Sequence, residues 1–561
     1  MQNPPAARYF LALLTLALAL ASVLGWWWLR ARPVALQEPV PATIGAQAAQ
    51  TLPCVSYAPF RRPGINPFNP SAVVTPTQIE EDLTILKTRT SCIRTYGLGQ
   101  GLDALPAIAA RLGLRVKLGV WLARDAAQNW RELERGLALA RQFKGTVDLL
   151  IVGNEVLLRR ELLPDELATY LRHAKQRSPV PVSYADVWEF WLRHAALGAH
   201  VDVVTAHILP YWEDDPVAVG GAVAHVHAVA AMLRQRFATK AVWIGETGWP
   251  AAGRQRAGAV PGLVEQSRFV RELLHSTASA PLDYNLIEAF DQPWKRAFEG
   301  AMGGYWGLFD QFGQPRVALS GVVVEDLRWW RGLAGALIGA AFGAVLGVAL
   351  SAWFGTVRTT GLRIARDARL GAALAPLTLA GALLGAIIPV QVLALQQWDR
   401  TPWEWFTSLL LAIPGAALTV VAALQLTHAF RLPPRAALWV ERAGALLRLA
   451  VLFCAASVAL ILLVDARYRP FPWWWFAAPA ASLLVWRAGG LAWNRPCPEE
   501  WLLAGILAAC AMAVAIIEGW RNAQALAFCA LLIVLAGSIV LGFRAIASSA
   551  SNAAGAHSSA V

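Results

Sequence analysis

The stretch AVWIGETGWP, residues 241–250, carries a single carboxylate, Glu246, late in an apolar, β-branched run and just before Thr-Gly-Trp-Pro. An unpaired charge in an apolar site is costly, so a buried strand normally excludes Glu. Two interpretations are open at this point. Either the strand has ended and Glu246 lies in solvent, or the carboxylate lies at the tip of a strand and faces a cleft.

Seven further strand-like runs alternate with helical stretches along residues 54–295. One helical stretch, TPTQIEEDLTILKTR, opens with a Thr N-cap signal, and another, DELATYLRHAKQR, has the spacing of a helical face. Eight βα repeats in about 250 residues predict an α/β fold, the (β/α)8 TIM barrel. The other seven runs are CVSYAPF (54–60), CIRTYG (92–97), RVKLGVWL (115–122), VDLLIVGNE (147–155), PVSYAD (181–186), VDVVTAHILPYW (201–212) and DYNLIEAFDQPWK (283–295).

The barrel interpretation predicts where the carboxylates lie. In a TIM barrel the catalytic residues lie at the C-terminal ends of the strands. Glu155 ends the fourth run and Glu246 comes late in the seventh, so both are predicted to point into one mouth. Two carboxylates across a cleft are what glycoside hydrolysis needs, because one protonates the leaving oxygen while the other attacks the anomeric carbon or activates water.

Six motifs make this interpretation more specific. They are YAPFRRPG, IRTYG, VGNEVL, HILPYWED, GETGWPAAGR and EAFDQPWK, and together they span nearly all of residues 54–315. In these motifs the domain resembles glycoside hydrolase family 17, the β-1,3-glucanases and related glucosyltransferases, and its bacterial branch in particular. The resemblance implies a retaining mechanism with Glu155 as the general acid/base and Glu246 as the nucleophile.

The same resemblance implies a set of sugar-binding residues. Asn154 would hydrogen-bond the 2-hydroxyl of the sugar at the cleavage site, and Tyr211 lies where family members place a Tyr near the nucleophile. His207 stands where many relatives have Asn. For the tyrosines and Trp294 a packing role is the alternative, and for Glu288 a structural ion pair with Lys295. The residues expected to line the glycone side are Tyr96, Glu288, Trp294 and Lys295.

The proposed chemistry requires Glu155 to change its protonation state during the reaction. This residue must be protonated to assist departure of the leaving group and ionised to activate the acceptor, so we expect it to have a raised pKa while Glu246 stays ionised. The nine His are scattered and indicate no metal site. No phosphate-binding Gly loop for a nucleotide sugar is visible, so we expect no cofactor and a preformed glucan as donor.

The rest of the chain is apolar. The sequence is 57% hydrophobic and only 15% charged, and it holds eight candidate membrane spans of roughly 20 residues. The first is longer than the apolar core of a signal peptide, which favours an uncleaved anchor. We expect an anchor (1–32), a Pro/Ala-rich tether (33–52), the barrel (53–330), an all-α membrane domain of about seven transmembrane helices (331–545) and a disordered tail (546–561). The eight spans are 9–29, 332–357, 371–395, 404–430, 445–465, 472–486, 501–519 and 524–543.

Charge and cysteine placement predict the compartment. The loops 358–369 and 431–443 are rich in Arg, so the positive-inside rule puts them in the cytoplasm and the barrel in the periplasm of a bacterial inner membrane. The arginines flanking the first segment argue weakly the other way. Cys54 and Cys92 could pair there, or stay as buried thiols. The net charge of +12 lies almost wholly outside residues 51–330, which argues against nucleic-acid binding.

Three functions are compatible with this organisation. Attachment to a membrane domain favours transglucosylation that elongates or β-1,6-branches periplasmic β-1,3-glucan, an arrangement that resembles proteins of bacterial β-glucan synthesis, with a membrane β-glucan synthase as a candidate partner. An endo-β-1,3-glucanase is the alternative, since water can also release the glucosyl group. A scaffold or conduit for glucan export is the third. Arg448, Asp465 and Glu518 lie near span ends, where snorkelling is the simpler explanation.

Overall fold

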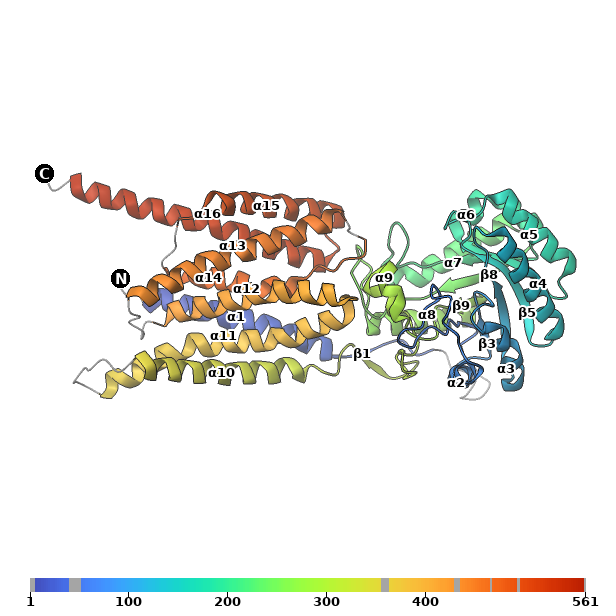
Figure 1. Ribbon diagram of the computed structural model, residues 1–561, viewed down its shortest axis with the longest axis horizontal. Helices are drawn as coiled ribbons and strands as arrows, with labels where there is room; N and C mark the ends of the chain where they lie inside the picture. Colours follow the sequence, from blue (N-terminus) through green and yellow to red (C-terminus); the bar gives the residue numbers. More distant parts are fainter. Residues whose placement is uncertain are drawn as a thin grey trace. The chain divides into compact units, whose positions relative to one another are not determined.

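The computed structural model describes residues 6–39, 52–354, 363–427, 434–464, 467–491 and 495–558. The chain divides into two compact units, one of residues 33–323 and one of residues 1–32 with 324–561 (Figure 1). The barrel unit therefore ends a few residues before the expected boundary at 330. Most of the expected tether, residues 40–51, lies outside the described residues, and its start forms the short strand β1 (Pro33–Ala35), which pairs with β10 (Val322–Val324).

The barrel unit is a closed, eight-stranded parallel barrel, as the sequence predicted. Its strands follow one another in chain order, and β2 and β9 close the ring where Val55 pairs with Leu286. Each of these strands begins in one of the eight predicted runs, and only β6 extends past its run, by Val187. The strands are β2 (Val55–Ser56), β3 (Cys92–Arg94), β4 (Arg115–Val120), β5 (Val147–Asn154), β6 (Val182–Val187), β7 (Val203–His207), β8 (Ala241–Thr247) and β9 (Tyr284–Leu286).

Helices follow the strands and begin where the sequence signals them. Thr75 caps α2, its side chain accepting a hydrogen bond from the backbone of Gln78, and Asp125 caps α4 in the same way. Their apolar faces pack on the strands, which leaves the strand ends to form the mouth. The helices of the unit are α2 (Pro76–Lys87), α3 (Leu105–Leu112), α4 (Ala126–Gln142), α5 (Pro164–Arg177), α6 (Trp188–Arg193), α7 (Val219–Arg236), α8 (Leu263–Ser279) and α9 (Arg296–Glu299).

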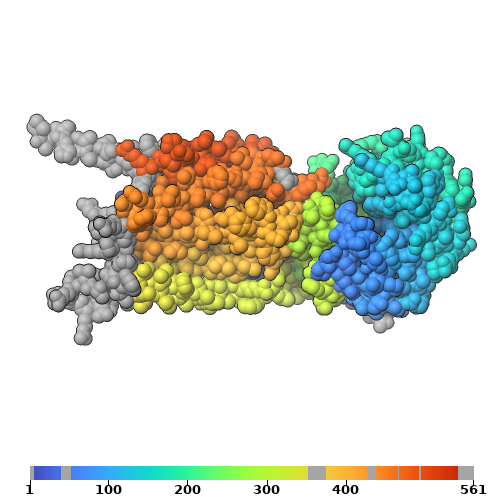
Figure 2. All heavy atoms as spheres, in the orientation of Figure 1, coloured from blue at the N-terminus to red at the C-terminus, as the bar shows by residue number. Residues whose placement is uncertain are grey.

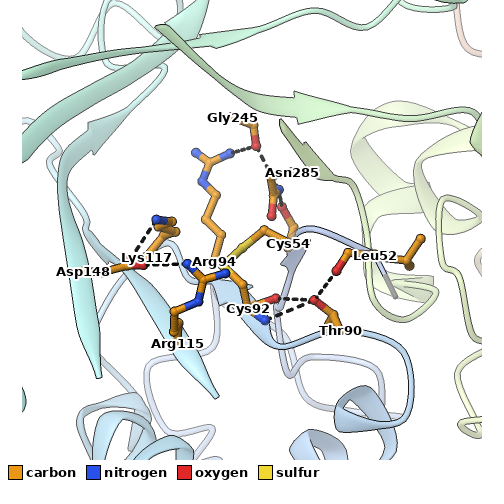
Figure 3. The surroundings of a disulfide bond; sticks show 11 residues. Leu52, Cys54, Thr90, Cys92, Arg94, Arg115, Lys117, Asp148, Gly245 and Asn285 are labelled. Carbon is orange, nitrogen blue, oxygen red and sulfur yellow. Dashed lines mark hydrogen bonds and ion pairs between the residues drawn. A yellow bond between two sulfur atoms is a disulfide. The ribbon is translucent and has the colours of Figure 1, made fainter. Parts of the chain in front are cut away.

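A disulfide joins the first two strands of the barrel. Cys54, just before β2, pairs with Cys92 at the start of β3, and both are buried. Figure 3 shows the bond beside Arg94, whose side chain extends from β3 towards the carbonyl oxygen of Gly245. Of the two states left open by the sequence, the structure has the paired one, and such bonds persist in oxidising compartments.

Breaking this disulfide is expected to lower the melting temperature of the barrel by about 10 °C. The bond spans 38 residues, and closing a loop of that length stabilises a folded domain by about 4 kcal/mol. The measurement is thermal unfolding of Cys54→Ser/Cys92→Ser, with and without dithiothreitol. Cys454→Ser, which removes a free cysteine, is the control. A wild-type melting temperature that is insensitive to reduction would contradict the prediction.

The second unit is a bundle of long helices, whose side chains form a continuous surface on the face shown in Figure 2. Among the described residues, seven helices are long and apolar enough to cross a membrane. The predicted span 472–486 is α14, which has only 16 residues and is mostly buried against α1, α12 and α16. The helices are α1 (Ala6–Ala31), α10 (Trp330–Phe354), α11 (Arg363–Trp398), α12 (Pro402–Leu426), α13 (Pro434–Val464), α14 (Trp473–Ala488), α15 (Pro498–Glu518) and α16 (Ala523–Ser558).

Glycines bring α10 and α11 into backbone contact. A Cβ atom added to Gly339 would lie 2.0 Å from the carbonyl oxygen of Gly381, and one added to Gly381 would lie 2.1 Å from that of Gly339. The pair Gly335 and Gly385 meets in the same way. In a lipid bilayer the hydrophobic effect does not drive helices together, and small residues promote association because they let two helix backbones pack closely.

Two expectations about the membrane unit are wrong. Arg448 does not snorkel, because it is buried and makes a two-pronged ion pair with Glu500 at 2.6 and 2.9 Å. The expected disordered tail from residue 546 continues α16 as a helix to Ser558, in a segment rich in Ala, the best helix former. Asp465 lies outside the described residues, as do Arg358 and Arg431 of the two basic loops.

Candidate active site

The two carboxylates of the sequence analysis meet at the mouth of the barrel. Glu155 directly follows β5, and Glu246 lies in β8 with only 5% of its surface exposed. One carboxylate oxygen of each lies within 4.8 Å of the other. This separation fits the short spacing of a retaining glycosidase and leaves too little room for the water of an inverting one. Glu246 is thus a strand-tip carboxylate, the second of the two initial interpretations.

Arg94, on β3, compensates the charge of the buried Glu246 carboxylate by an ion pair. Its Nη1 donates to Glu246 Oε1 at 3.0 Å and to the carbonyl oxygen of Gly245 at 2.7 Å, while Nη2 donates to Asn154 Oδ1 at 2.6 Å. The arginine is completely buried. It therefore pairs Glu246 with a permanent positive charge and sets the orientation of the Asn154 amide.

Tyr96 provides a second donor to the same carboxylate. Its hydroxyl lies 2.8 Å from both Glu246 Oε1 and Ser56 Oγ. Burial, and next the negative charge of Glu246, raise the pKa of Tyr96 well above its usual value. The phenol therefore stays protonated and donates a hydrogen bond to the Glu246 carboxylate. Tyr96, which was predicted to lie beside the cleft, therefore also contacts the proposed nucleophile Glu246 directly.

His207, at the end of β7, links the two carboxylates. Its Nδ1 lies 2.9 Å from Glu155 Oε1, and its Nε2 lies 3.2 Å from Arg94 Nη2. A carboxylate can only accept, so Nδ1 carries a hydrogen and His207 donates to Glu155. The Arg94 guanidinium lies against the other ring nitrogen and fixes the orientation of the ring.

The expected raised pKa of Glu155 is wrong in this structure. Burial acts to raise the pKa of Glu155, but the hydrogen bond from His207 and the positive charges of Arg94 and Arg159 act to lower it, and the net pKa lies below its usual value. The groups that lower this pKa come from other parts of the chain and cannot be read from the two carboxylates alone. Their net effect favours the ionised form of Glu155.

His207→Ala is expected to move the basic limb of the kcat/KM profile to higher pH. Glu155 serves as the acid only while protonated, so kcat/KM falls as pH rises through its pKa, and losing the His207 donor raises that pKa. The measurement is the pH dependence of kcat/KM on a β-glucan donor. His173→Ala, on α5, is the control. A basic limb that stays in place would show that His207 does not control the proton of Glu155.

The backbone at Glu155 is held in an uncommon conformation. Its φ of 52° lies in the left-handed region, which is costly for a residue with a side chain. The next turn is tied down by Tyr184, whose hydroxyl accepts from the Leu157 N–H at 3.1 Å and donates to Asp186. Burial raises the pKa of Asp186 to about 6. This network aims the Glu155 side chain into the mouth.

Three of the four residues expected on the glycone side, Glu288, Trp294 and Lys295, lie together after β9. Lys295 Nζ lies 3.1 and 3.0 Å from the two oxygens of Glu288, so the structural ion pair that the sequence left open is present. Burial raises the pKa of Glu288 to about 7, although Lys295 acts in the opposite sense. Trp294 is half-buried and donates its indole N–H to Gln292. The structure therefore leaves the rings of this segment available to a ligand.

Tyr211 packs inside the barrel unit. It is completely buried, its hydroxyl donates to the carbonyl oxygen of Arg254, and its ring packs against Trp249 and Trp306. The packing alternative therefore describes Tyr211, and we leave it out of the proposed sugar-binding set.

The site does not suit a metal ion. Glu155, His207 and Glu246 each offer one ligand atom, and these atoms lie within 4.8 Å of one another. However, the guanidinium of Arg94 already donates to Glu246 and faces His207 Nε2. A second cation placed there would be repelled by a permanent positive charge.

Two residues were not predicted from the sequence, Arg94 and Trp121. Trp121 follows β4, is 36% exposed, and has the Arg159 guanidinium carbon 4.1 Å from its ring centre. Arg159 also donates to the carbonyl oxygens of Leu122 and Asn154. Arg94 could have been found, since a charge in the apolar run CIRTYG is the same signal that marks Glu246. The pairing of Trp121 with Arg159 has no signal in the sequence.

Arg94→Met is expected to lower kcat/KM by at least about 100-fold. The change removes the charged donor to Glu246 and the donor that orients Asn154, and the loss of one such preorganised donor typically costs that much. Arg115→Met, which breaks an exposed contact with Asp148 at the start of β4, should leave kcat/KM unchanged. Since Arg94 is buried, circular dichroism must confirm that the variant is folded. A folded variant with wild-type kcat/KM would refute this role.

The fold and the paired carboxylates define a glycoside hydrolase barrel. The family model described as the BtgE/BtgC glycoside hydrolase domain matches residues 54–307. The match covers most of the barrel unit and agrees with the resemblance seen in the motifs, while the assignment to a bacterial branch stays a prediction.

Similar proteins are known from fungi. A glucan 1,3-beta-glucosidase of Candida albicans is 25% identical over 252 residues, which are 41% of this chain and 82% of the relative. A protein of the same name from Schizosaccharomyces pombe is 28% identical over 232 residues, 38% of this chain and 72% of the relative. A family 17 beta-1,3-glucanosyltransferase structure from Rhizomucor miehei aligns with 23% identity and a TM-score of 0.42, covering 48% of this chain and 98% of that one.

Proposed function

We propose that this chain is a membrane-bound retaining enzyme that acts on β-1,3-glucan. The observation that carries the proposal is the pair Glu155 and Glu246, with oxygens within 4.8 Å at the mouth of a closed barrel. The similarity to glucan 1,3-beta-glucosidases supports β-1,3-glucan as the substrate class.

The reaction proceeds by double displacement. A carboxylate oxygen of Glu246 attacks the anomeric carbon while Glu155 gives its proton to the departing glycosidic oxygen, so the glycosidic bond breaks as the glucosyl ester forms. Glu155 then takes a proton from the acceptor hydroxyl, whose oxygen displaces Glu246. Arg94 and Tyr96 orient Glu246 throughout, and Asn154 offers its amide N–H to the 2-hydroxyl, because its carbonyl oxygen is already bonded to Arg94.

Trp121 favours transfer to a sugar over hydrolysis. It follows β4, next to the strand that carries Glu155, and so lies on the side where the leaving group departs and the acceptor enters. The Arg159 guanidinium packs against the Trp121 ring and also donates to the carbonyl oxygen of Asn154. A partly exposed, rigid indole offers an apolar face on which an acceptor glucose can stack, and this would let a sugar compete with water.

The test is incubation of the enzyme with a reducing-end-labelled laminari-oligosaccharide. Products longer than the donor support transfer, and only shorter products would support an endo-β-1,3-glucanase. Linkage analysis of the longer products distinguishes elongation from β-1,6 branching. Trp121→Ala should lower the ratio of transfer to hydrolysis, and an unchanged ratio would refute the acceptor role of Trp121.

We further propose that the barrel lies in the periplasm of a bacterial inner membrane, with a membrane β-glucan synthase as the supplier of the donor. The buried disulfide supports an oxidising compartment. The scaffold or conduit alternative finds little support in Arg448, because this residue is neutralised by Glu500. Reporter fusions after Arg366 and after Arg435 should behave as cytoplasmic, and one in residues 33–52 as periplasmic. A cytoplasmic reporter in residues 33–52 would overturn this topology.

A further inference from the structure

Three aromatic rings form an exposed cluster on the barrel unit. Phe68 lies 5.6 Å from Trp294 and 5.0 Å from Phe298 between ring centres, and Trp294 lies 6.4 Å from Phe298. Phe68 is 66% exposed and Phe298 is 58% exposed. Single exposed apolar residues are ordinary, but three neighbouring rings in water form a patch that needs a reason. We call Phe68, Trp294 and Phe298 the rim cluster.

The chain topology places the rim cluster beside the mouth. Phe68 lies in the loop that follows β2, and the other two rings lie in the segment that follows β9. These strands are neighbours, because Val55 of β2 pairs with Leu286 of β9. Loops that follow the strands of a parallel barrel all emerge at its C-terminal face, where Glu155 and Glu246 lie.

Hydrogen bonds hold the central ring in place. The indole N–H of Trp294 donates to Gln292 Oε1 at 2.9 Å, and Gln292 Nε2 donates to the carbonyl oxygen of Ala58 at 2.7 Å. Gln292 thereby connects the segment after β9 to the loop after β2, from which Phe68 comes. Trp294 is thus held in place before a ligand binds, so ordering it costs little conformational entropy.

The rim cluster lies on the nucleophile's side of the mouth. Lys295, the neighbour of Trp294, is paired with Glu288, and Glu288 interacts electrostatically with Glu246. Trp121 follows β4, three strands round the ring from β9 and next to β5, the strand that Glu155 directly follows. The sugar that Glu246 attacks therefore lies between two aromatic sites, with the leaving group towards Trp121 and the rest of the donor towards the rim cluster.

We propose that the rim cluster is a stacking site for glucose units of the donor that lie beyond the reacting sugar, towards its non-reducing end, and that it sets the preference for long donors. This inference rests on the proposed function. A β-linked glucose presents apolar C–H faces to which aromatic rings bind, and several rings in one patch hold consecutive units of a chain. A short donor does not reach the cluster, whereas a long one gains its binding energy.

The test compares donors of increasing length on the full chain in detergent micelles. The variant is Phe68→Ala/Phe298→Ala, and the control is Phe312→Ala, which removes a phenylalanine that is 70% exposed and is no part of the cluster. We expect kcat/KM of the variant to fall about tenfold for laminarihexaose, a loss equal to roughly one stacking contact. The value for an activated aryl β-glucoside, which has no glucose unit beyond the reacting sugar, should not change, which also shows that the variant is folded.

Each other outcome overturns something specific. Wild-type kcat/KM at every donor length would refute the stacking site, and so would an equal loss at every length, which would mean that the rings support the reacting centre. Wild-type values in micelles with a loss only in liposomes would assign the cluster to a lipid surface instead. If the wild-type chain processes no laminari-oligosaccharide, the proposed function itself fails.

Discussion

Glu246→Ala is expected to abolish both transfer and hydrolysis, with kcat reduced by about 10⁴-fold or more. The variant lacks the oxygen that forms the bond to the anomeric carbon, and no other described carboxylate in the mouth is held by both Arg94 and Tyr96. The measurement is release of an aryl leaving group together with product analysis on a laminari-oligosaccharide. Near wild-type turnover would show that the nucleophile has been wrongly assigned.

Two controls separate chemistry from folding. Removing Glu246 leaves the guanidinium of the completely buried Arg94 without its anion, which costs stability. Glu246→Gln keeps an acceptor oxygen for Arg94 and Tyr96 and should be equally inactive with a melting temperature closer to that of the wild type. Glu134→Ala, which removes an exposed carboxylate on α4, should leave kcat unchanged. Azide added to Glu246→Ala should yield an α-configured glycosyl azide, because only one displacement then occurs.

Glu155→Ala is expected to fail with unactivated glucans and to survive the first step with an activated donor. An aryl β-laminaribioside with a good leaving group needs little protonation, so the glucosyl ester on Glu246 should form. Its breakdown should be slow, since no base remains to activate the acceptor. Azide needs no base and should accelerate this step, giving a β-configured glycosyl azide by two displacements.

The same experiment can refute the assignment of Glu155. If the activated donor is inert and azide changes nothing, Glu155 is not the acid/base. We expect Glu155→Ala to fold. Glu155 is partly exposed, and His207 loses its contact with this carboxylate but keeps its contact with Arg94. The pH profile offers an independent check, since the basic limb should disappear from the reaction of Glu155→Ala with an activated donor.

The architecture could be predicted from the sequence because its signals are local. Each of the eight strands begins within a short apolar run. Thr75 marks the start of α2, because its side chain caps the helix. Position at a strand end is likewise a local property, which is why Glu155 and Glu246 could be named before their distance was known. Seven spans follow from length and hydropathy alone, whereas α14 shows that an apolar run can also be a short, buried helix.

What required the tertiary structure is the identity of partners far apart in the sequence. Arg94 reaches Glu246 across 152 residues of chain, and His207 reaches Glu155 across 52. These contacts lower the pKa of Glu155, whereas the sequence pattern alone suggested a raised one. The burial of Tyr211 and the exposure of Phe68 are also products of packing.

The sequence by itself therefore determined the barrel, the membrane helices and the two carboxylates, because strand and helix periodicity and strand-end position depend on neighbouring residues. Only the tertiary structure decided the protonation of Glu155, the support of Glu246 and which aromatic rings remain open to a sugar. The physical reason is that pKa and exposure depend on the field and the contacts of groups brought together from different strands, and no local pattern records which groups those will be.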